Sequence, residues 1–360
     1  IKVEIKKYKN NQIICMQGEK TDKLFVLRSG TIKVAVNQEK KITEELVNKT
    51  GQVVNRINQP NQTIGEIGLL LNRERSASLV AEGPVELEII SFDGGVNLSE
   101  IIKLNKQIGT NILNTVIDRI IHTSKQIHQL KTRIDKEIAV IDKYAAGLMQ
   151  MKTDNQATAA QIQNLKKSLK SKYDIIRENI NSVNRDFKSY KPVQLEENNV
   201  LPKKSLFFNE TSTNDDFYLL LSGKISILCN NILVYSSDKK HTILSNYSIL
   251  DKSRPAENYF TFVTNDDTRI KKIAKSKFFE MLDNEPVLYS YLSKILSLLL
   301  VNTDKALLEL SRKNEILKQI IFSDADSLNN ILQKIKAEPK DENQSKLANE
   351  FVEDIKPLAE

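Results

Sequence analysis

The first 96 residues carry short stretches in which apolar and polar positions alternate, which is the pattern of half-buried β-strands. Alternation runs through residues 1–5, 31–36 and 85–89, and residues 24–27 form a continuous apolar run. Eight of the eleven glycines in the chain fall in this region and separate the stretches. Short strands divided by glycine-bearing turns predict a β sandwich or a small barrel over 1–96.

The middle segment, 97–190, has a different pattern, because apolar residues step by three or four and no proline interrupts them. A narrow stripe with this spacing is the seam of a coiled coil. It predicts one helix from about residue 97 to 152, a break at 153–155 and a second helix beyond. Two arrangements stay open: the helices fold back as an antiparallel hairpin, or they form one kinked rod that dimerises. The seam positions are Leu113, Ile117, Ile120, Ser124, Ile127, Leu130, Ile134, Ile138, Ile141, Ala145 and Leu148, then Ile162, Leu165, Leu169, Ile176, Ile180, Val183 and Phe187.

After Pro192 the β pattern returns, with strand candidates at 217–221, 224–228, 232–235 and 259–263. From Pro286 apolar residues again recur at helical spacing, and a polar tail follows. The order β, helix, β, helix is that of a module duplicated once. We therefore expect an α+β fold divided into a β domain (1–96), long helices (97–190), a second β domain (191–284), C-terminal helices (285–336) and a polar tail (337–360).

Charge is concentrated in the middle segment. The chain has 53 Lys and Arg against 46 Asp and Glu, and residues 97–190 hold sixteen basic and nine acidic residues, so this segment accounts for the whole net charge of +7. A basic surface can meet nucleic acid, anionic lipid or an acidic protein, but a solvated lysine-rich helical face explains the same count and is the favoured interpretation. The densest apolar stretch, 295–301, is too short for a membrane span. Two distant cysteines, Cys15 and Cys229, fit a reducing cytoplasm.

One stretch carries candidate chemistry: the letters GEIG at residues 65–68, followed by RSAS at 75–78. Two glycines let a backbone approach a ligand closely. The two leucines after them begin a short helical turn whose amides attract an anion. Arg75 offers a planar fork that matches a phosphate, and Glu66 carries acceptors that suit a ribose hydroxyl. An anion site beside a sugar acceptor indicates a sugar phosphate as the ligand.

Two blocks of this segment resemble the cyclic nucleotide-binding domain, shared by the catabolite activator protein family and the regulatory subunits of cyclic-AMP-dependent protein kinase. The upstream block, 14–19 and 24–34, is similar to the family's glycine–acid turn followed by a strand–glycine–strand hairpin. The downstream block, 65–78, resembles its phosphate-binding cassette, with a Gly-Glu pair, two leucines and Arg-x-Ala-Ser. The resemblance covers residues 1–92 and implies a β-roll (jelly-roll) fold with cAMP or cGMP as the ligand.

The resemblance also implies a role for each residue of the cassette. Glu66 accepts a hydrogen bond from the ribose 2′-hydroxyl, and Arg75 pairs with the cyclic phosphate. An alternative is that these two side chains form a surface ion pair in a fold that has lost its ligand. The helix after Ile90 usually closes over the base in this family, and here it continues into the long helix. The other positions implied to line the nucleotide are Gly65, Ile67 and Gly68 beside the sugar-phosphate, Ser76 on the phosphate or base, and Ala77 through its amide.

The second β segment resembles the same fold with the chemistry removed. Residues 206–208 and 217–227 are similar to the first hairpin block, but the letters YSIL at 247–250 stand where the glycine and acid of the cassette stand in the first copy. Asn258 falls at the place of Arg75. Burying a sugar phosphate without a cation or an amide cradle is costly, so we expect no ordinary nucleotide binding in this copy. A docking or dimerisation role is the expectation instead.

No metal or cofactor is expected, since His122, His128 and His241 form no metal-binding set and no nucleophile–base pair or Walker loop is present. The leading hypothesis is a non-enzymatic cytoplasmic receptor that binds the cyclic nucleotide in its first domain. The helical segment, with Gly109 as its soft point, relays binding to a protein partner or to a homo-oligomer. The alternative is a structural or scaffold protein with a vestigial site. A transcription regulator and a nucleic-acid partner are disfavoured, because no winged helix-turn-helix is visible and the tail is acidic.

Overall fold

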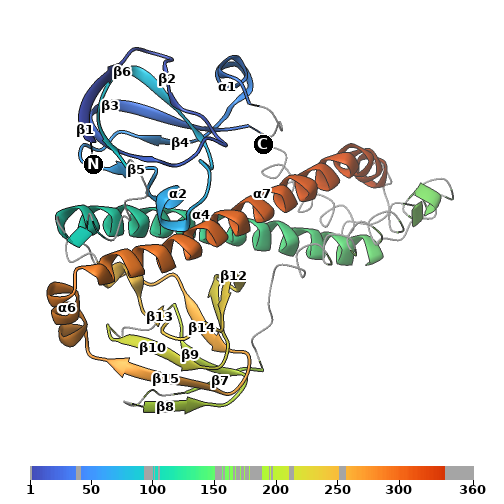
Figure 1. Cartoon of the computed structure of the whole chain (residues 1–360). Coiled ribbons are helices and arrows are strands. Elements are labelled where there is room, and N and C mark those ends of the chain that lie inside the picture. Colours follow the sequence, from blue (N-terminus) through green and yellow to red (C-terminus); the bar gives the residue numbers. More distant parts are fainter. Residues whose placement is uncertain are drawn as a thin grey trace.

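Two β units lie on opposite sides of a pair of long helices (Figure 1). The helices are α4 (Lys106–Gln150) and α7 (Val287–Lys336), and they run side by side between the units. Within the part of the chain that the structure describes, no helix is long and apolar enough to cross a membrane. The structure is a computed structural model that describes residues 2–37, 42–92, 106–150, 189–193, 198–210, 215–250 and 257–336, with isolated positions between 100 and 195.

The first β unit is one sheet built around two long strands that pair antiparallel along their length. The order is β1-β6-β3-β4, with β2 added to β6 and β5 added to β3. Its core is the apolar face predicted from the alternation, including Phe25, Leu27 and Ile32, each at most 2% exposed. The strands are β1 (Lys2–Tyr8), β2 (Ile13–Cys15), β3 (Lys23–Val36), β4 (Gln52–Ile57), β5 (Thr63–Ile64) and β6 (Ser78–Ser91).

Residues 24–36 form one continuous strand, so the predicted hairpin at Gly30 is wrong. Gly30 has a φ of 96°, and the register of β3 against β6 shifts on both sides of residue 29. A Cβ at Gly30 would lie 2.3 Å from the Pro84 carbonyl oxygen. Gly30 therefore allows β3 and β6 to lie close together where both are bulged, and the chain does not reverse direction there.

Two short helices complete the first unit. Helix α1 (Glu44–Thr50) lies between β3 and β4 and is capped by Thr43, whose side chain accepts from the Leu46 amide at 3.3 Å. Two glutamates in its first turn and a lysine in its last turn complement the helix dipole. Helix α2 (Glu66–Leu71) follows β5 and lies against the long helices in Figure 1.

The seam predicted for the middle segment is buried inside this chain. Leu113, Ile117, Ile120, Ile127 and Ile134 of α4 are each at most 2% exposed, and they share one core with α7 and the second β unit. The two helices are parallel, because the contact of Gly109 with Tyr289 is followed along both helices by the contact of Thr123 with Asp304. Helix α7 begins directly after Pro286, as predicted. The predicted second helix of the middle segment falls largely outside the described residues, so the hairpin and the dimeric rod both stay predictions.

The second β unit has two sheets and repeats the strand pairing of the first. Strand β13 follows a turn and pairs with β10, as β5 pairs with β3, and β8 pairs with β15 as β1 pairs with β6. The four strands predicted here are present, and helix α6 (Lys275–Asn284) then leads into α7. The strands are β7 (Lys191–Pro192), β8 (Asn198–Leu201), β9 (Ser205–Phe208), β10 (Phe217–Ser222), β11 (Ile225–Cys229), β12 (Ile232–Ser237), β13 (Ile243–Leu244), β14 (Thr261–Thr264) and β15 (Thr268–Ile273).

Candidate functional site

Arg75 lies just before β6 with its guanidinium against the turn that begins α2. Its Nη1 donates to the Gly65 carbonyl oxygen at 3.1 Å, and its Nη2 donates to the Lys23 carbonyl oxygen at 2.6 Å. The guanidinium carbon also lies 5.1 Å from the centre of the Phe25 ring. Only 7% of Arg75 is exposed. These contacts hold a cation in a partly enclosed place at the start of the cassette segment, which we define as residues 65–77.

Gly65 makes this arrangement possible. It has a φ of 88°, in the left-handed region that side chains with a Cβ rarely adopt. A Cβ added there would lie 2.0 Å from Arg75 Nη1. The sequence analysis placed Gly65 and Arg75 at one site, and the structure brings them into contact.

The upstream block of the resemblance holds the backbone of Arg75 in place. The Arg75 amide donates to the Glu19 carbonyl oxygen at 2.9 Å, and the Gly18 amide donates to the Arg75 carbonyl oxygen, also at 2.9 Å. The two sequence blocks are therefore parts of one structural unit. The glycine–acid turn at 18–19 positions the arginine of the cassette segment.

Glu66 is 1% exposed, but its partner is not Arg75. Its Oε1 accepts from Arg119 Nη1 of helix α4 at 3.3 Å. The same guanidinium reaches Asp304 of helix α7, with Nη2 3.7 Å from Oδ2. The alternative of a surface ion pair between Glu66 and Arg75 is therefore wrong, because each of the two side chains has other partners and is buried.

Two further contacts fasten the cassette segment to the long helices. Thr63 of β5 donates through its hydroxyl to the Thr115 hydroxyl of α4 at 3.0 Å, and both residues are buried. Leu70 of α2 belongs to the large core that contains the apolar faces of α4 and α7. Helix α2 and the strand before it are therefore in direct contact with the helix pair.

The other predicted positions have different surroundings. Ile67 is half-buried against the large core, and Gly68 packs so closely that a Cβ would lie 2.4 Å from Thr21 Oγ1. Ser76 is exposed and Ala77 is half-buried, directly after Arg75. Their contact with a nucleotide remains a prediction.

The Cys15 thiol is buried and lies near the positive charge of Arg75. Burial raises its pKa to about 11, although the nearby positive charge of Arg75 acts in the opposite direction. Among the described residues, no group of three or more His, Cys, Asp or Glu side chains could hold a metal ion.

In the second β unit, the turn that the sequence analysis aligned with the cassette is fully buried. Residues Tyr247–Leu250 form a 3₁₀ turn in which all four residues are buried, and this turn contacts α4. Asn258, which the sequence analysis aligned with Arg75, donates from its amide to the carbonyl oxygens of Asn209 and Phe260. A neutral amide bonded to the backbone cannot supply the charge that a phosphate requires.

Next to this turn, charged and aromatic side chains of the second β unit meet side chains of α4. Lys125 lies 2.9 Å from Glu257 and over the Tyr259 ring, at 5.8 Å from its centre. His128 packs edge-on against the same ring at 5.6 Å and lies 3.5 Å from Glu210. The second β unit therefore contacts α4 through the turn at 247–250 and through Glu257 and Tyr259.

Sequence reasoning missed three residues that meet their partners only through the fold. Arg119 lies 53 positions from Glu66, Thr115 lies 52 positions from Thr63, and Asp304 lies 185 positions from Arg119. None of the three belongs to a local motif. One signal was available, because Arg119 directly precedes the buried seam residue Ile120 and, with Asp118, interrupts the apolar residues at 116–117 and 120–121 of α4. A charged residue beside a buried seam requires a partner.

Comparison with known proteins agrees with the geometry of the first unit. The model of the cyclic nucleotide-binding domain family matches residues 5–94. Residues 5–94 therefore match the cyclic nucleotide-binding domain, and the chain has a mixed α and β fold in which this part is followed by long helices.

The solved structures with some similarity share little sequence with this chain. A cAMP-bound PfPKA-R is 12% identical over 91% of this chain and 80% of that chain, with a TM-score of 0.27. The regulatory domain of Toxoplasma gondii PKA with cAMP is 12% identical over 80% of this chain and 84% of that chain, with a TM-score of 0.23. A cAMP-binding acyltransferase from Mycobacterium smegmatis is 21% identical over 34% of each chain, with a TM-score of 0.27.

Proposed function

We propose that this protein is a non-enzymatic receptor for cAMP or cGMP, and that the nucleotide binds at the cassette segment of the first β unit. The buried Arg75 guanidinium supplies the positive charge for the cyclic phosphate. Because Gly65 has no side chain, the backbone there can lie close to the nucleotide. The Glu66 carboxylate accepts a hydrogen bond from the ribose. The family match over residues 5–94 supports this ligand class.

The observation that carries a regulatory role is the shared guanidinium of Arg119. It joins Glu66 of the cassette segment to Asp304 of α7, at 3.3 and 3.7 Å. In the proposed mechanism a ribose hydroxyl donates to Glu66 and competes with Arg119 for that carboxylate. Arg119 then keeps Asp304 as its partner, and α2 is released from one of its ties to the helix pair. Binding energy is thereby converted into a shift of α2 against α4 and α7.

The helix pair in turn presents a surface for a partner. Leu308 and Ile316 of α7 are 53% and 44% exposed and lie eight residues apart, close to one face of the helix. We infer that a protein partner or a second copy of the chain binds there. The second β unit, docked on α4, acts in this proposal as a degenerate copy that anchors the helix and does not bind nucleotide.

Calorimetric titration of cAMP and of cGMP tests the proposal. We expect saturable binding of at least one nucleotide at one site per chain, and loss of that binding in Arg75→Ala. Arg73→Ala is the matched control, because Arg73 lies in the same loop and is exposed. Absence of binding by both nucleotides, or equal binding by wild type and Arg75→Ala, would contradict the receptor function.

A scaffold with a vestigial site is the second candidate, and one observation favours it. The guanidinium of Arg75 and the carboxylate of Glu66 already have partners inside the chain. If these contacts are only structural, Arg75→Ala lowers the melting temperature while neither nucleotide raises it. In a receptor, by contrast, the melting temperature of the wild type rises with nucleotide concentration.

A further inference from the structure

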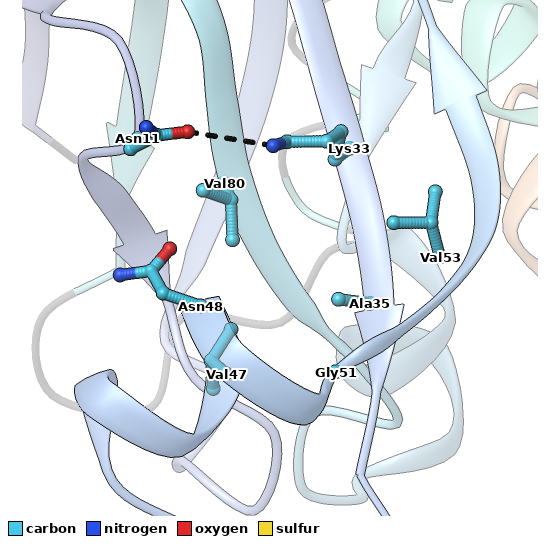
Figure 2. Close-up of a pocket in the computed structure, with 8 residues that line it drawn as sticks. All are labelled: Asn11, Lys33, Ala35, Val47, Asn48, Gly51, Val53 and Val80. Carbon is cyan, nitrogen blue, oxygen red and sulfur yellow. Dashed lines mark hydrogen bonds between the residues drawn. The ribbon is translucent and has the colours of Figure 1, made fainter.

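A second concave site lies in the first β unit, between α1 and the outer face of the sheet. Its volume is about 290 Å³. Figure 2 shows Asn11 and Lys33 directed toward one another at one end and Val47 and Asn48 of α1 at the other. The eight residues that line it are Asn11, Lys33, Ala35, Val47, Asn48, Gly51, Val53 and Val80, and none of them belongs to the cassette segment.

The floor of this cleft is apolar and fixed. Ala35, Val47 and Val80 are each 3% exposed and form a small core of their own, separate from the main core of the sheet. Val53 forms a wall and is 40% exposed. Val53 therefore offers the exposed apolar surface of this cleft, and a compact apolar body that covers it gains the ordinary free energy of removing that surface from water.

One end of the cleft carries a positive charge that has no acidic neighbour in the lining. Lys33 Nζ lies 3.4 Å from Asn11 Oδ1. In the register of β3 and β4, Lys33 stands directly opposite Arg56, which is an unfavourable pairing of like charges. Arg56 is neutralised by Glu82 at 2.9 Å. An anion at this end of the cleft would neutralise the charge of Lys33 in the same way.

The other end carries an acceptor. Asn37 is 4% exposed, and its Oδ1 has no hydrogen-bond partner. This oxygen would lie 3.2 Å from a Cβ at Gly51, so the absence of a side chain at Gly51 brings the cleft close to it. The cleft thus combines a cation at its mouth, an apolar floor and an unsatisfied acceptor beside its closed end.

We propose that this cleft binds a small organic carboxylate with a compact apolar body. The carboxylate lies on Lys33 and the side-chain amide of Asn11, and the apolar body packs against Val53 above the floor that Val47 and Val80 form. A hydroxyl or amine at the far end of the ligand would donate to Asn37. The site is independent of the cyclic nucleotide, because it shares no residue with the cassette segment.

The test follows the methyl groups of Val47, Val53 and Val80 by NMR in the full chain during titration with hexanoate, and in parallel with hexanamide, which has the same shape without charge. We expect saturable shifts with hexanoate and about fivefold weaker binding of hexanamide, as one partly exposed ion pair would give. Lys33→Gln should remove this preference. Lys49→Gln, on the exposed side of α1, should keep it.

Two results would overturn the proposal. One is the absence of saturable shifts at these three valines in the wild type. The other is a preference for hexanoate over hexanamide that survives in Lys33→Gln. A titration repeated with saturating cAMP separates this site from the first, because equal hexanoate affinity with and without cAMP is expected even if the cassette segment binds nothing.

Discussion

Arg119 and Glu66 form an ion pair between two parts of the molecule that are distant in sequence, with 3.3 Å between Nη1 and Oε1. The glutamate side chain is 1% exposed and the arginine side chain is 35% exposed. A carboxylate so deeply buried is stable in its charged form only with a partner. The pair therefore makes the cassette segment of the first β unit dependent on the position of α4.

Removal of Arg119 should destabilise the fold because it leaves Glu66 buried and unpaired. We expect Arg119→Ala to lower the free energy of unfolding by about 2 kcal/mol, measured by urea denaturation. Arg312→Ala is the control, since Arg312 lies on the partner helix α7 and is exposed. In a Glu66→Gln background the cost of Arg119→Ala should fall sharply. Equal costs in both backgrounds would show that the pair is not the cause.

Gly65→Ala should abolish nucleotide binding by displacing Arg75. The new Cβ would lie 2.0 Å from Arg75 Nη1, and the residue would have to keep a φ of 88°. Gly83→Ala separates these two effects, because Gly83 has a φ of 82° and nothing within 4 Å of its added Cβ. Both variants should lose about 1 kcal/mol of stability to backbone strain, but only Gly65→Ala should lose binding in calorimetry. Full binding by Gly65→Ala would exclude Arg75 as the phosphate contact.

Glu137 of α4 should make stability depend on pH. Its side chain is 8% exposed, its Oε2 has no hydrogen-bond partner, and burial raises its pKa despite the nearby Arg133 and Lys318. A carboxyl whose pKa is raised by folding stabilises the native state below its unfolded pKa, and this contribution is lost as pH rises through the folded value. Glu137→Gln should therefore be more stable than the wild type at neutral pH, by about 1 kcal/mol.

Thermal melts between pH 3 and pH 8 check this prediction. The difference between Glu137→Gln and wild type should shrink as the pH falls, because the carboxyl is then protonated in both states. Lys131→Gln tests the other buried charge nearby and should not reproduce this pH dependence. If the difference in melting temperature between the two proteins is constant over the whole pH range, packing and not titration of Glu137 is the cause.

The extent to which sequence predicted this molecule is clear from individual residues. Gly65 and Arg75 were placed at one site from two short motifs, because the contact between them is local and depends on a turn that needs glycine. The seam of α4 was predicted from its spacing, but its partner was not, since periodicity identifies a buried face and not what covers it. The partners of Arg119 and the role of Asp304 could not be predicted, because they depend on how α4 and α7 pack around α2.

Gly109 shows the same limit and yields the last prediction. The sequence suggests a soft point in a long helix, and glycine is indeed about 1 kcal/mol less favourable than alanine in a helix interior. In the structure Gly109 is buried where α4 meets α7, and a Cβ would lie 2.7 Å from Ile102 Cγ2 and 3.0 Å from Tyr289 Cβ. Gly109→Ala should therefore destabilise the protein by about 1 kcal/mol despite the better helix propensity, measured by urea denaturation. In an Ile102→Ala background the nearest clash is absent, so the same substitution should cost less, and a Gly109→Ala variant more stable than the wild type would show that the helices do not need this close approach.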